Sequence, residues 1–431
     1  MRNRDVFDSL ESNVRTYCRN FPVVLSAARG HLLTDEAGNT YIDFLSGAGV
    51  MSYGHNNPKI IRPVIEYLER DGIVHSLDLH TSAKKAFLET FESTILVPRL
   101  LNYKVQFAGP TGTNAVEAAL KLARKVTGRH SVVAFTNGFH GVSLGALAAT
   151  ANGRKRKAAG TALHDVTRMP YDGFLGTGDT LAYIEAMLQR PGSGIDPPAA
   201  FILETVQAEG GLKVASSAWL QGIADLARRV GALLIVDDIQ AGCGRTGPFF
   251  SFEDAGIQPD IVCLSKAIGG AGFPMALVLI DESIDIWEPG EHCGTFRGNN
   301  LAFVAATAAL DSYWRDGNLE KDVRRKGKII ADALQRLAGD GAVVRGRGMI
   351  QGIAWTDPSI ARAVSAAAFR RGLIIETCGP QDEVLKLLPP LTIDDRDLAK
   401  ALAVIAEAIA EVVASTPRAA AKQSDKEQSL V

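Results

Sequence analysis

Two stretches decide the fold, Leu233-Leu234-Ile235-Val236-Asp237-Asp238-Ile239-Gln240 and Ile261-Val262-Cys263-Leu264-Ser265-Lys266. Each begins as a short apolar run rich in branched side chains and ends in charged or polar residues. Similar runs recur at 131–135, 200–203 and 276–280, and helix-period stretches such as 115–126 lie between several of them. Short, fully apolar strands that alternate with helices are typical of a mostly parallel sheet covered on both faces. We therefore predict an α/β fold.

The segments on either side of this sheet predict a second, smaller unit. Residues 28–44 contain two half-buried runs separated by a glycine-containing turn at 35–39, which predicts a hairpin. After about residue 300, long helical segments lead into further strands and a closing helix over 395–413. We expect a large domain over 61–325, a small domain formed by 1–60 and 326–415, and a disordered tail over 416–431.

The composition excludes several classes of protein. The 431 residues include 46 basic and 48 acidic side chains, so a net charge of −2 offers no field that would attract nucleic acid or an anionic membrane. No apolar run of about 18 residues is present. Residues 1–10 lack the apolar core of a secretory signal, and the five cysteines form no CxxC pair. We expect a cytoplasmic protein with reduced thiols and without nucleic-acid, membrane or metal partners.

Lys266 is the first candidate catalytic residue. It stands directly between an apolar run and the glycine pair Gly269-Gly270. Lysine is ordinarily a solvated surface residue, but ligands of open α/β sheets bind at the carboxyl ends of the strands. At that edge, partial loss of hydration favours the neutral amine, which is a nucleophile toward a carbonyl carbon.

Asp237 ends another apolar run, and we expect it at the same edge of the sheet. Alone, such an aspartate could equally be a helix cap or a metal ligand. Together with Lys266 it fits pyridoxal phosphate, which needs a lysine to hold it and a carboxylate to keep its ring nitrogen protonated. Gln240 follows three residues later and is placed to reach the other polar group of the ring.

The phosphate and the ring of such a cofactor need further groups. Residues 107–114 lead from a strand into the helix at 115–126, where Asn114 and Glu117 resemble a capping box. Small residues at a helix start let backbone amides approach a phosphate, although a purely structural turn is an alternative. No GxxxxGK[ST] nucleotide loop is present. Phe139 offers a flat apolar partner for the ring; a core phenylalanine beside a hydrogen-bonded histidine is an equally good interpretation.

Ordered blocks of sequence at 204–211, 237–247, 264–270 and 294–300 carry a family resemblance. They resemble the class III, or ω-type, aminotransferases, and the similarity extends from about Asp35 to Val413. The resemblance implies an enzyme of the pyridoxal-phosphate-dependent transferase fold type I. In that fold a large domain with a mostly parallel sheet is joined by a small α+β domain built from both chain ends.

The resemblance also implies a role for each candidate residue. Lys266 would hold the cofactor and then shuttle a proton between it and the substrate carbon, and Asp237 would pair with the ring nitrogen. Thr295 would reach the phosphate bound in the neighbouring subunit, which makes the enzyme a homodimer or a higher homo-oligomer. The further cofactor contacts would be Gly112, Thr113, Phe139, His140 and Gln240.

Glu209 and Lys386 mark a departure from the family. In many ω-aminotransferases this glutamate holds an arginine aside, and the arginine later clamps a substrate carboxylate. This chain has Lys386 at that position, just before Pro389-Pro390. Because an ammonium is a point charge without the planar fork of a guanidinium, the clamp cannot be the same. Either Lys386 binds the carboxylate less directionally, or another cation such as Arg297 binds it.

Residues 51–58, 75–81 and 294–300, with Lys386, resemble the diaminobutyrate-forming branch of the family, which serves ectoine synthesis. The implied reaction moves the amino group of L-glutamate to L-aspartate 4-semialdehyde. Alternatives on the same fold are aminotransferases for ornithine, acetylornithine, 4-aminobutyrate or diaminopropane, and a mutase that recycles the cofactor. The intact Lys266 and Asp237 argue against a catalytically silent member, and the absence of a GxGxxG motif argues against a nicotinamide dehydrogenase.

Overall fold

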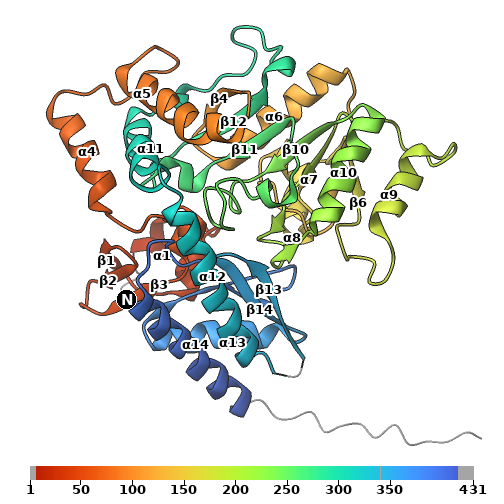
Figure 1. Cartoon of the computed structure of the whole chain (residues 1–431). Coiled ribbons are helices and arrows are strands. Elements are labelled where there is room, and N and C mark those ends of the chain that lie inside the picture. The colour runs from red at the N-terminus through yellow and green to blue at the C-terminus, as the bar shows by residue number, and fades with distance from the viewer. Residues whose placement is uncertain (1–5, 340, 416–431) are drawn as a thin grey trace, which may run out of the picture.

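A seven-stranded sheet forms the centre of the larger part of the molecule, in a computed structural model that describes residues 6–339 and 341–415 (Figure 1). The strand order is β4-β12-β11-β10-β7-β5-β6. Neighbours from β11 to β6 are parallel, and β12 alone is antiparallel to both of its neighbours. The strands are β4 (Tyr103–Gly109), β5 (Val132–Phe135), β6 (Val166–Met169), β7 (Ala200–Leu203), β10 (Leu233–Asp237), β11 (Ile261–Leu264) and β12 (Ala276–Asp281).

Both faces of this sheet are buried, as the apolar runs predicted. In β7, Ala200 and Ile202 belong to the core beneath α6 (Gly112–Thr127), whereas Phe201 belongs to the larger core on the opposite face. There α10 (Ser217–Val230) packs against β10. The apolar face expected on the first of these helices is confirmed, because Ala115, Ala118, Ala119 and Leu122 are fully buried.

The smaller part of the molecule lies below the central sheet in Figure 1 and uses strands from both ends of the chain. The predicted hairpin is confirmed as the antiparallel pair of β2 (Leu32–Asp35) and β3 (Thr40–Asp43). β15 (Leu373–Ile374) pairs in parallel with β3, so a strand from beyond residue 370 completes a sheet begun before residue 45. β1 (Leu25–Arg29) closes the other edge.

A second antiparallel sheet of this smaller part has the order β13-β14-β17-β16. Its strands are β13 (Ala342–Arg347), β14 (Ile350–Trp355), β16 (Glu376–Cys378) and β17 (Val384–Leu387). α13 (Pro358–Arg370) packs on this sheet and on α14 (Asp395–Ser415). The small α+β domain built from both chain ends is therefore confirmed, while the predicted tail at 416–431 lies outside the described residues.

The helices not yet named complete the two parts. α11 (Asn300–Tyr313) packs against α4 (Pro58–Glu69) and α5 (Ser82–Phe91) in the upper part of Figure 1, and α12 (Asn318–Leu337) runs from there to the lower part. A short two-stranded ribbon, β8 (Val206–Gln207) with β9 (Lys213–Val214), follows β7. The remaining α-helices are α1 (Val6–Leu10), α2 (Tyr17–Asn20), α3 (Ser46–Gly49), α7 (Leu144–Ala149), α8 (Gly153–Lys157) and α9 (Thr180–Gln189).

The start of α6 differs from the capping box expected of Asn114 and Glu117. The N-cap is Thr111, whose N–H donates to Asn114 Oδ1 (3.2 Å). Glu117 faces α7 instead, where its Oε1 accepts from the Ser143 hydroxyl (2.7 Å) and the Ala146 N–H (3.0 Å). The expected box was wrong because the true cap lies three residues earlier than the pattern suggested.

Candidate active site

The carboxyl ends of four strands bring most of the predicted site residues to one edge of the large sheet. Asp237 ends β10, and Lys266 follows β11 after a single residue. Phe139 and His140 follow β5, and Gly112 follows β4 at the first turn of α6. These strands point the same way, so their ends meet at the edge where open α/β sheets bind their ligands.

Lys266 sits in strained backbone and carries a free ammonium. Its φ is +53°, a left-handed conformation that is uncommon outside glycine and that collects at functional sites. Its side chain makes no hydrogen bond or ion pair with any of the described residues. Burial lowers the pKa of Lys266, and the nearby Lys386 adds to the lowering, although Glu209 and two other carboxylates oppose it. The amine is therefore placed to lose its proton and act as a nucleophile.

Asp237 is fixed by His140. The Asp237 Oδ2 lies 2.8 Å from His140 Nδ1, and because a carboxylate only accepts, Nδ1 carries the hydrogen. The other oxygen, Oδ1, accepts from the Ile239 N–H at 3.2 Å. Both side chains are at most 5 % exposed. A buried carboxylate oriented in this way is suited to hold a proton on a ring nitrogen.

The first turn of α6 forms a cradle for an anion. The N–H groups of Gly112 and Thr113 have no acceptor within the helix, and the helix dipole adds positive potential there. A Cβ on Gly112 would lie 2.8 Å from Ile239 Cδ1, so the Ile239 side chain would have to shift to admit a larger residue. The Thr113 hydroxyl lies 2.5 Å from the Ser143 hydroxyl. The cradle offers backbone amides and hydroxyls, which are groups that bind a phosphate.

The remaining contacts also fit pyridoxal phosphate. Phe139 is half-buried, and its ring presents one face to the Lys155 ammonium, 4.3 Å from the ring centre. Gln240 donates from Nε2 to the Ala48 carbonyl (2.7 Å), and its Oε1 is buried without a partner among the described residues. That unpaired atom leaves a polar group for a ligand. With Lys266, Asp237 and the α6 cradle, the set matches the groups of this cofactor.

Lys386 lies between two carboxylates. Its Nζ is 2.6 Å from Glu209 Oε1, so this glutamate forms an ion pair with a lysine. On its other side Nζ is 3.0 Å from Glu376 Oε1, and Glu376 stands directly opposite Lys386 in the β16–β17 pair. The Lys386 side chain is completely buried. The arrangement is thus a buried carboxylate–ammonium–carboxylate set.

The charges of this set shift its pKa values. Burial raises the pKa of Glu209, but Lys386 and then Lys266 outweigh that effect and lower it to about 2. Burial raises the pKa of Glu376 above its ordinary value, and Lys386 only partly opposes this. Burial lowers the pKa of Lys386, but Glu209 and Glu376 together raise it well above its ordinary value. Lys386 and Glu209 are therefore an ammonium and a carboxylate at neutral pH.

Two further buried acids lie near Asp237. Burial, and then the charge of Asp237, raise the pKa of Glu204 well above its ordinary value. Glu204 accepts from the Phe139 N–H at 2.9 Å and so fixes the loop that carries the aromatic ring. Burial raises the pKa of Asp238 to about 7. Both acids therefore favour the neutral form more than an exposed carboxyl does.

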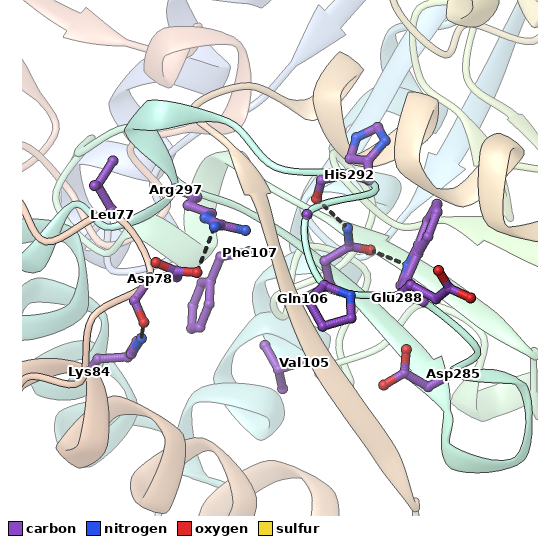
Figure 2. A pocket seen from close by; sticks show the side chains of 13 residues that line it. Leu77, Asp78, Lys84, Val105, Gln106, Phe107, Asp285, Glu288, His292 and Arg297 are labelled. Atoms are coloured by element: carbon purple, nitrogen blue, oxygen red, sulfur yellow. Dashed lines mark hydrogen bonds and ion pairs between the residues drawn. The ribbon is translucent and has the colours of Figure 1, made fainter.

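Thr295 and Arg297 lie apart from these residues. Both belong to a short turn, and Thr295 is exposed while its carbonyl accepts from His75 Nε2 at 2.7 Å. Figure 2 shows Arg297 and Lys84 directed at Asp78, with Arg297 Nη2 2.7 Å from the Asp78 carboxylate. Arg297, Lys84 and Asp78 line a pocket of about 410 Å³. Neither Lys266 nor Lys386 is among the described residues that line it. The described ion pair of Arg297 is thus with Asp78 and not with a residue around Lys266.

Sequence reasoning missed three residues of the site. Glu376 reaches Lys386 only through the register of the β16–β17 hairpin, which the sequence does not show. Burial and then the charge of Glu376 raise the pKa of Tyr17, which places this residue of α2 near that carboxylate. Lys155 lies in the basic run 153–157, and the asparagine cap before it was the one available signal that this run forms a helix beside Phe139.

Comparisons with known proteins agree with this geometry. A family model described as aminotransferase class-III matches residues 14–409. A diaminobutyrate–2-oxoglutarate transaminase of Bordetella parapertussis is 56 % identical over 96 % of this chain and 97 % of its own. The enzyme of that name from Vibrio cholerae is 54 % identical over 94 % of this chain and all of its own. An ornithine aminotransferase structure from Toxoplasma gondii, with partially occupied pyridoxal phosphate, superposes with a TM-score of 0.82 at 27 % identity, over 95 % of this chain and 94 % of its own.

Proposed function

This chain belongs to the class III aminotransferases, and on that premise we propose that it transfers the amino group of L-glutamate to L-aspartate 4-semialdehyde. The products are 2-oxoglutarate and L-2,4-diaminobutyrate, the diamino acid from which ectoine is made. The observation that carries this proposal is the Lys386–Glu209 pair at 2.6 Å, found in a chain that is 54–56 % identical to diaminobutyrate–2-oxoglutarate transaminases. An ornithine, acetylornithine or 4-aminobutyrate aminotransferase is the alternative.

The residues of the site divide the work of the first half-reaction. Pyridoxal phosphate, the cofactor of the family, accepts electrons from the substrate carbon and carries the amino group between the two substrates. Lys266 Nζ removes the proton from the α-carbon of glutamate. Asp237, held by His140, keeps the ring nitrogen protonated. The first turn of α6 holds the phosphate through Gly112 and Thr113.

The second half-reaction uses the same groups in the reverse order. Lys266 Nζ returns a proton to the terminal carbon of the semialdehyde, which leaves as the γ-carbon of diaminobutyrate. The α-carboxylate of glutamate needs a cation near Lys266, and Lys386 is the buried ammonium placed there. Glu209 covers Lys386 when the substrate presents no carboxylate at that point.

A spectrum of the purified protein tests the proposal. We expect a yellow absorption band that L-glutamate bleaches and that L-aspartate 4-semialdehyde restores. Ornithine, acetylornithine, 4-aminobutyrate and diaminopropane, each offered in place of glutamate, rank the alternative donors. A band that glutamate leaves unchanged would reject glutamate as the donor, and failure to reconstitute any band with pyridoxal phosphate would reject the enzyme itself.

Asp237→Asn should lower kcat by about 100-fold or more, because an amide does not hold the ring nitrogen in its protonated form. The side chain keeps its shape, so we expect the protein to fold and to bind the cofactor. Steady-state production of 2-oxoglutarate measures the loss, and the thermal midpoint checks the fold. A kcat within about threefold of the unsubstituted enzyme would show that Asp237 does not have this role.

We propose that the working enzyme is a homodimer in which the turn carrying Thr295 completes the phosphate site of the partner. That turn packs beside residues 73–79, since the Ser76 N–H donates to the Gly298 carbonyl (3.0 Å). Large apolar side chains are exposed across these two segments, and contiguous exposed apolar surface is typical of an interface. They are Ile73, Val74, Leu77, Leu79 and Phe296, which are between 44 % and 67 % exposed.

Phe296→Asp should weaken dimerisation by about 100-fold or more, because each of two symmetric copies would lose a buried aromatic side chain. Activity should fall with it at low protein concentration. Analytical ultracentrifugation measures the dissociation constant. Phe174→Asp is the matched control, since Phe174 is 52 % exposed in the segment between β6 and α9. Equal dissociation constants for the two variants would remove Phe296 from the interface.

We also propose that the enzyme works in the cytoplasm. All five cysteines are unpaired thiols, as expected in a reducing compartment. Among the helices of residues 6–339 and 341–415, none has the length and apolar character needed to cross a bilayer.

A further inference from the structure

The two carboxylates that flank Lys386 differ in how they meet the open site. Glu376 comes from the strand beside Lys386, and its side chain is 4 % exposed. Glu209 comes from the ribbon after β7, and its side chain is 25 % exposed. Of the charges around Lys266, Glu209 acts most strongly on the pKa of that lysine. Glu209 therefore faces the reacting centre, and Glu376 lies behind the ammonium.

We propose that Glu376 is a positioning residue, which holds the Lys386 ammonium in place while a substrate carboxylate replaces Glu209 on its open side. This inference rests on the proposed function, because it requires a donor with an α-carboxylate. In it, the cation stays fixed and the glutamate in front of it moves. The motion is small, because only one partly exposed side chain has to leave.

The charges explain why a second carboxylate is needed. If Glu209 left a lysine that had no other partner, a fully buried ammonium would be unpaired, which is strongly unfavourable. With Glu376 at 3.0 Å the ammonium keeps one carboxylate throughout. A lysine has three N–H donors and can bind two carboxylates at once, so the substrate simply takes the place that Glu209 leaves. The number of charges around Nζ is the same before and after.

Glu376 is itself held from behind. Tyr17 lies near its carboxylate, and the strand register fixes its backbone opposite Lys386. The register therefore keeps the Glu376 carboxylate beside the Lys386 ammonium, at 3.0 Å. This geometry suits a lysine, whose single charged atom needs an anchor on one side, whereas an arginine would offer a second N–H edge to its substrate.

The test is Glu376→Gln in the full-length holoenzyme, which removes the charge and keeps the shape. Stopped-flow bleaching by L-glutamate and recovery with 2-oxoglutarate should show a KM raised about tenfold or more, with the saturating rate changed by less than about threefold. The half-reaction with L-2,4-diaminobutyrate reacts at the terminal amine and leaves Glu209 on Lys386. Its KM should change by less than about threefold.

Glu383→Gln is the matched control, because Glu383 lies in the same hairpin and accepts from the Gln381 N–H rather than from Lys386. An unchanged KM for glutamate in Glu376→Gln would overturn the proposal, and so would an equal rise for both substrates, which indicates a merely structural role. If Glu376→Gln does not fold, Glu376→Asp should show a smaller rise confined to glutamate and 2-oxoglutarate. If the unsubstituted enzyme ignores glutamate, the proposed function fails instead.

Discussion

Lys266→Ala is expected to abolish transamination, lowering kcat/KM by about 10⁴-fold or more, and to remove the yellow absorption band. The substitution deletes the group that moves the substrate proton and the only covalent attachment that we assign to the cofactor. Production of 2-oxoglutarate and the absorption spectrum, both recorded with added pyridoxal phosphate, measure the two losses. Substantial turnover by this variant would contradict the role of Lys266.

Two controls separate this loss from misfolding. Lys266→Arg keeps a positive charge in the same pocket but offers no nucleophilic amine, so we expect it to fold and to be equally inactive. Lys328→Ala removes an exposed lysine of α12 that pairs only with Asp332, and it should leave the rate unchanged. All three variants should have a thermal midpoint close to that of the unsubstituted protein. The Lys266 side chain makes no hydrogen bond with the described residues, and Lys328 is exposed.

Lys386→Ala is expected to destabilise the protein by about 3–5 kcal/mol at neutral pH, because it leaves two buried carboxylates facing each other without a counter-charge. The loss should depend on pH. Glu209 has a pKa of about 2 in the folded protein, below its unfolded value, so it stabilises the fold above about pH 4 and loses that effect as the pH falls toward 2. Without Lys386 the pKa of Glu209 rises above its unfolded value. The Glu209 carboxyl group then destabilises the fold at neutral pH instead of stabilising it.

Urea unfolding of both proteins at pH 7 and pH 4 checks this prediction. The stability difference should be largest at pH 7, where burying the two carboxyl groups without a counter-charge costs most, and should shrink at pH 4, where both groups are readily protonated. Lys386→Arg, which keeps the charge, is the control and should lose less. The alanine substitution should also weaken the binding of glutamate or 2-oxoglutarate more than it weakens the binding of a carboxylate-free amine. Equal stability of the two proteins at pH 7 would show that Lys386 does not neutralise this set.

The sequence predicts the sheet best where a strand is apolar throughout. β7 and β11 occupy the predicted residues 200–203 and 261–264, because strands buried on both faces leave no polar residue to blur the signal. β6 was missed because Arg168 lies inside it. There the guanidinium donates to the carbonyls of Phe135, Ala148, Ala149 and Thr150, a role that only the tertiary structure defines.

The same distinction applies to the site. Lys266 and Asp237 could be predicted because each ends an apolar strand, and strand ends in parallel sheets share an edge. Glu376 could not, because its contact with Lys386 depends on the length and shape of the turn between two short strands. Tyr17 could not, because it reaches the site from a segment with no periodic pattern. The specificity of the site thus depends on features that local sequence does not encode.

The pairing of β15 with β3 also affects how the chain is made. β3 ends at residue 43 and β15 begins at residue 373, and ribosomes add roughly 5–20 residues per second. For tens of seconds the nascent chain therefore carries a finished hairpin whose outer edge has no partner. An unpaired strand edge invites association with other chains. The hairpin of residues 32–43 is thus a segment that a chaperone would protect during synthesis.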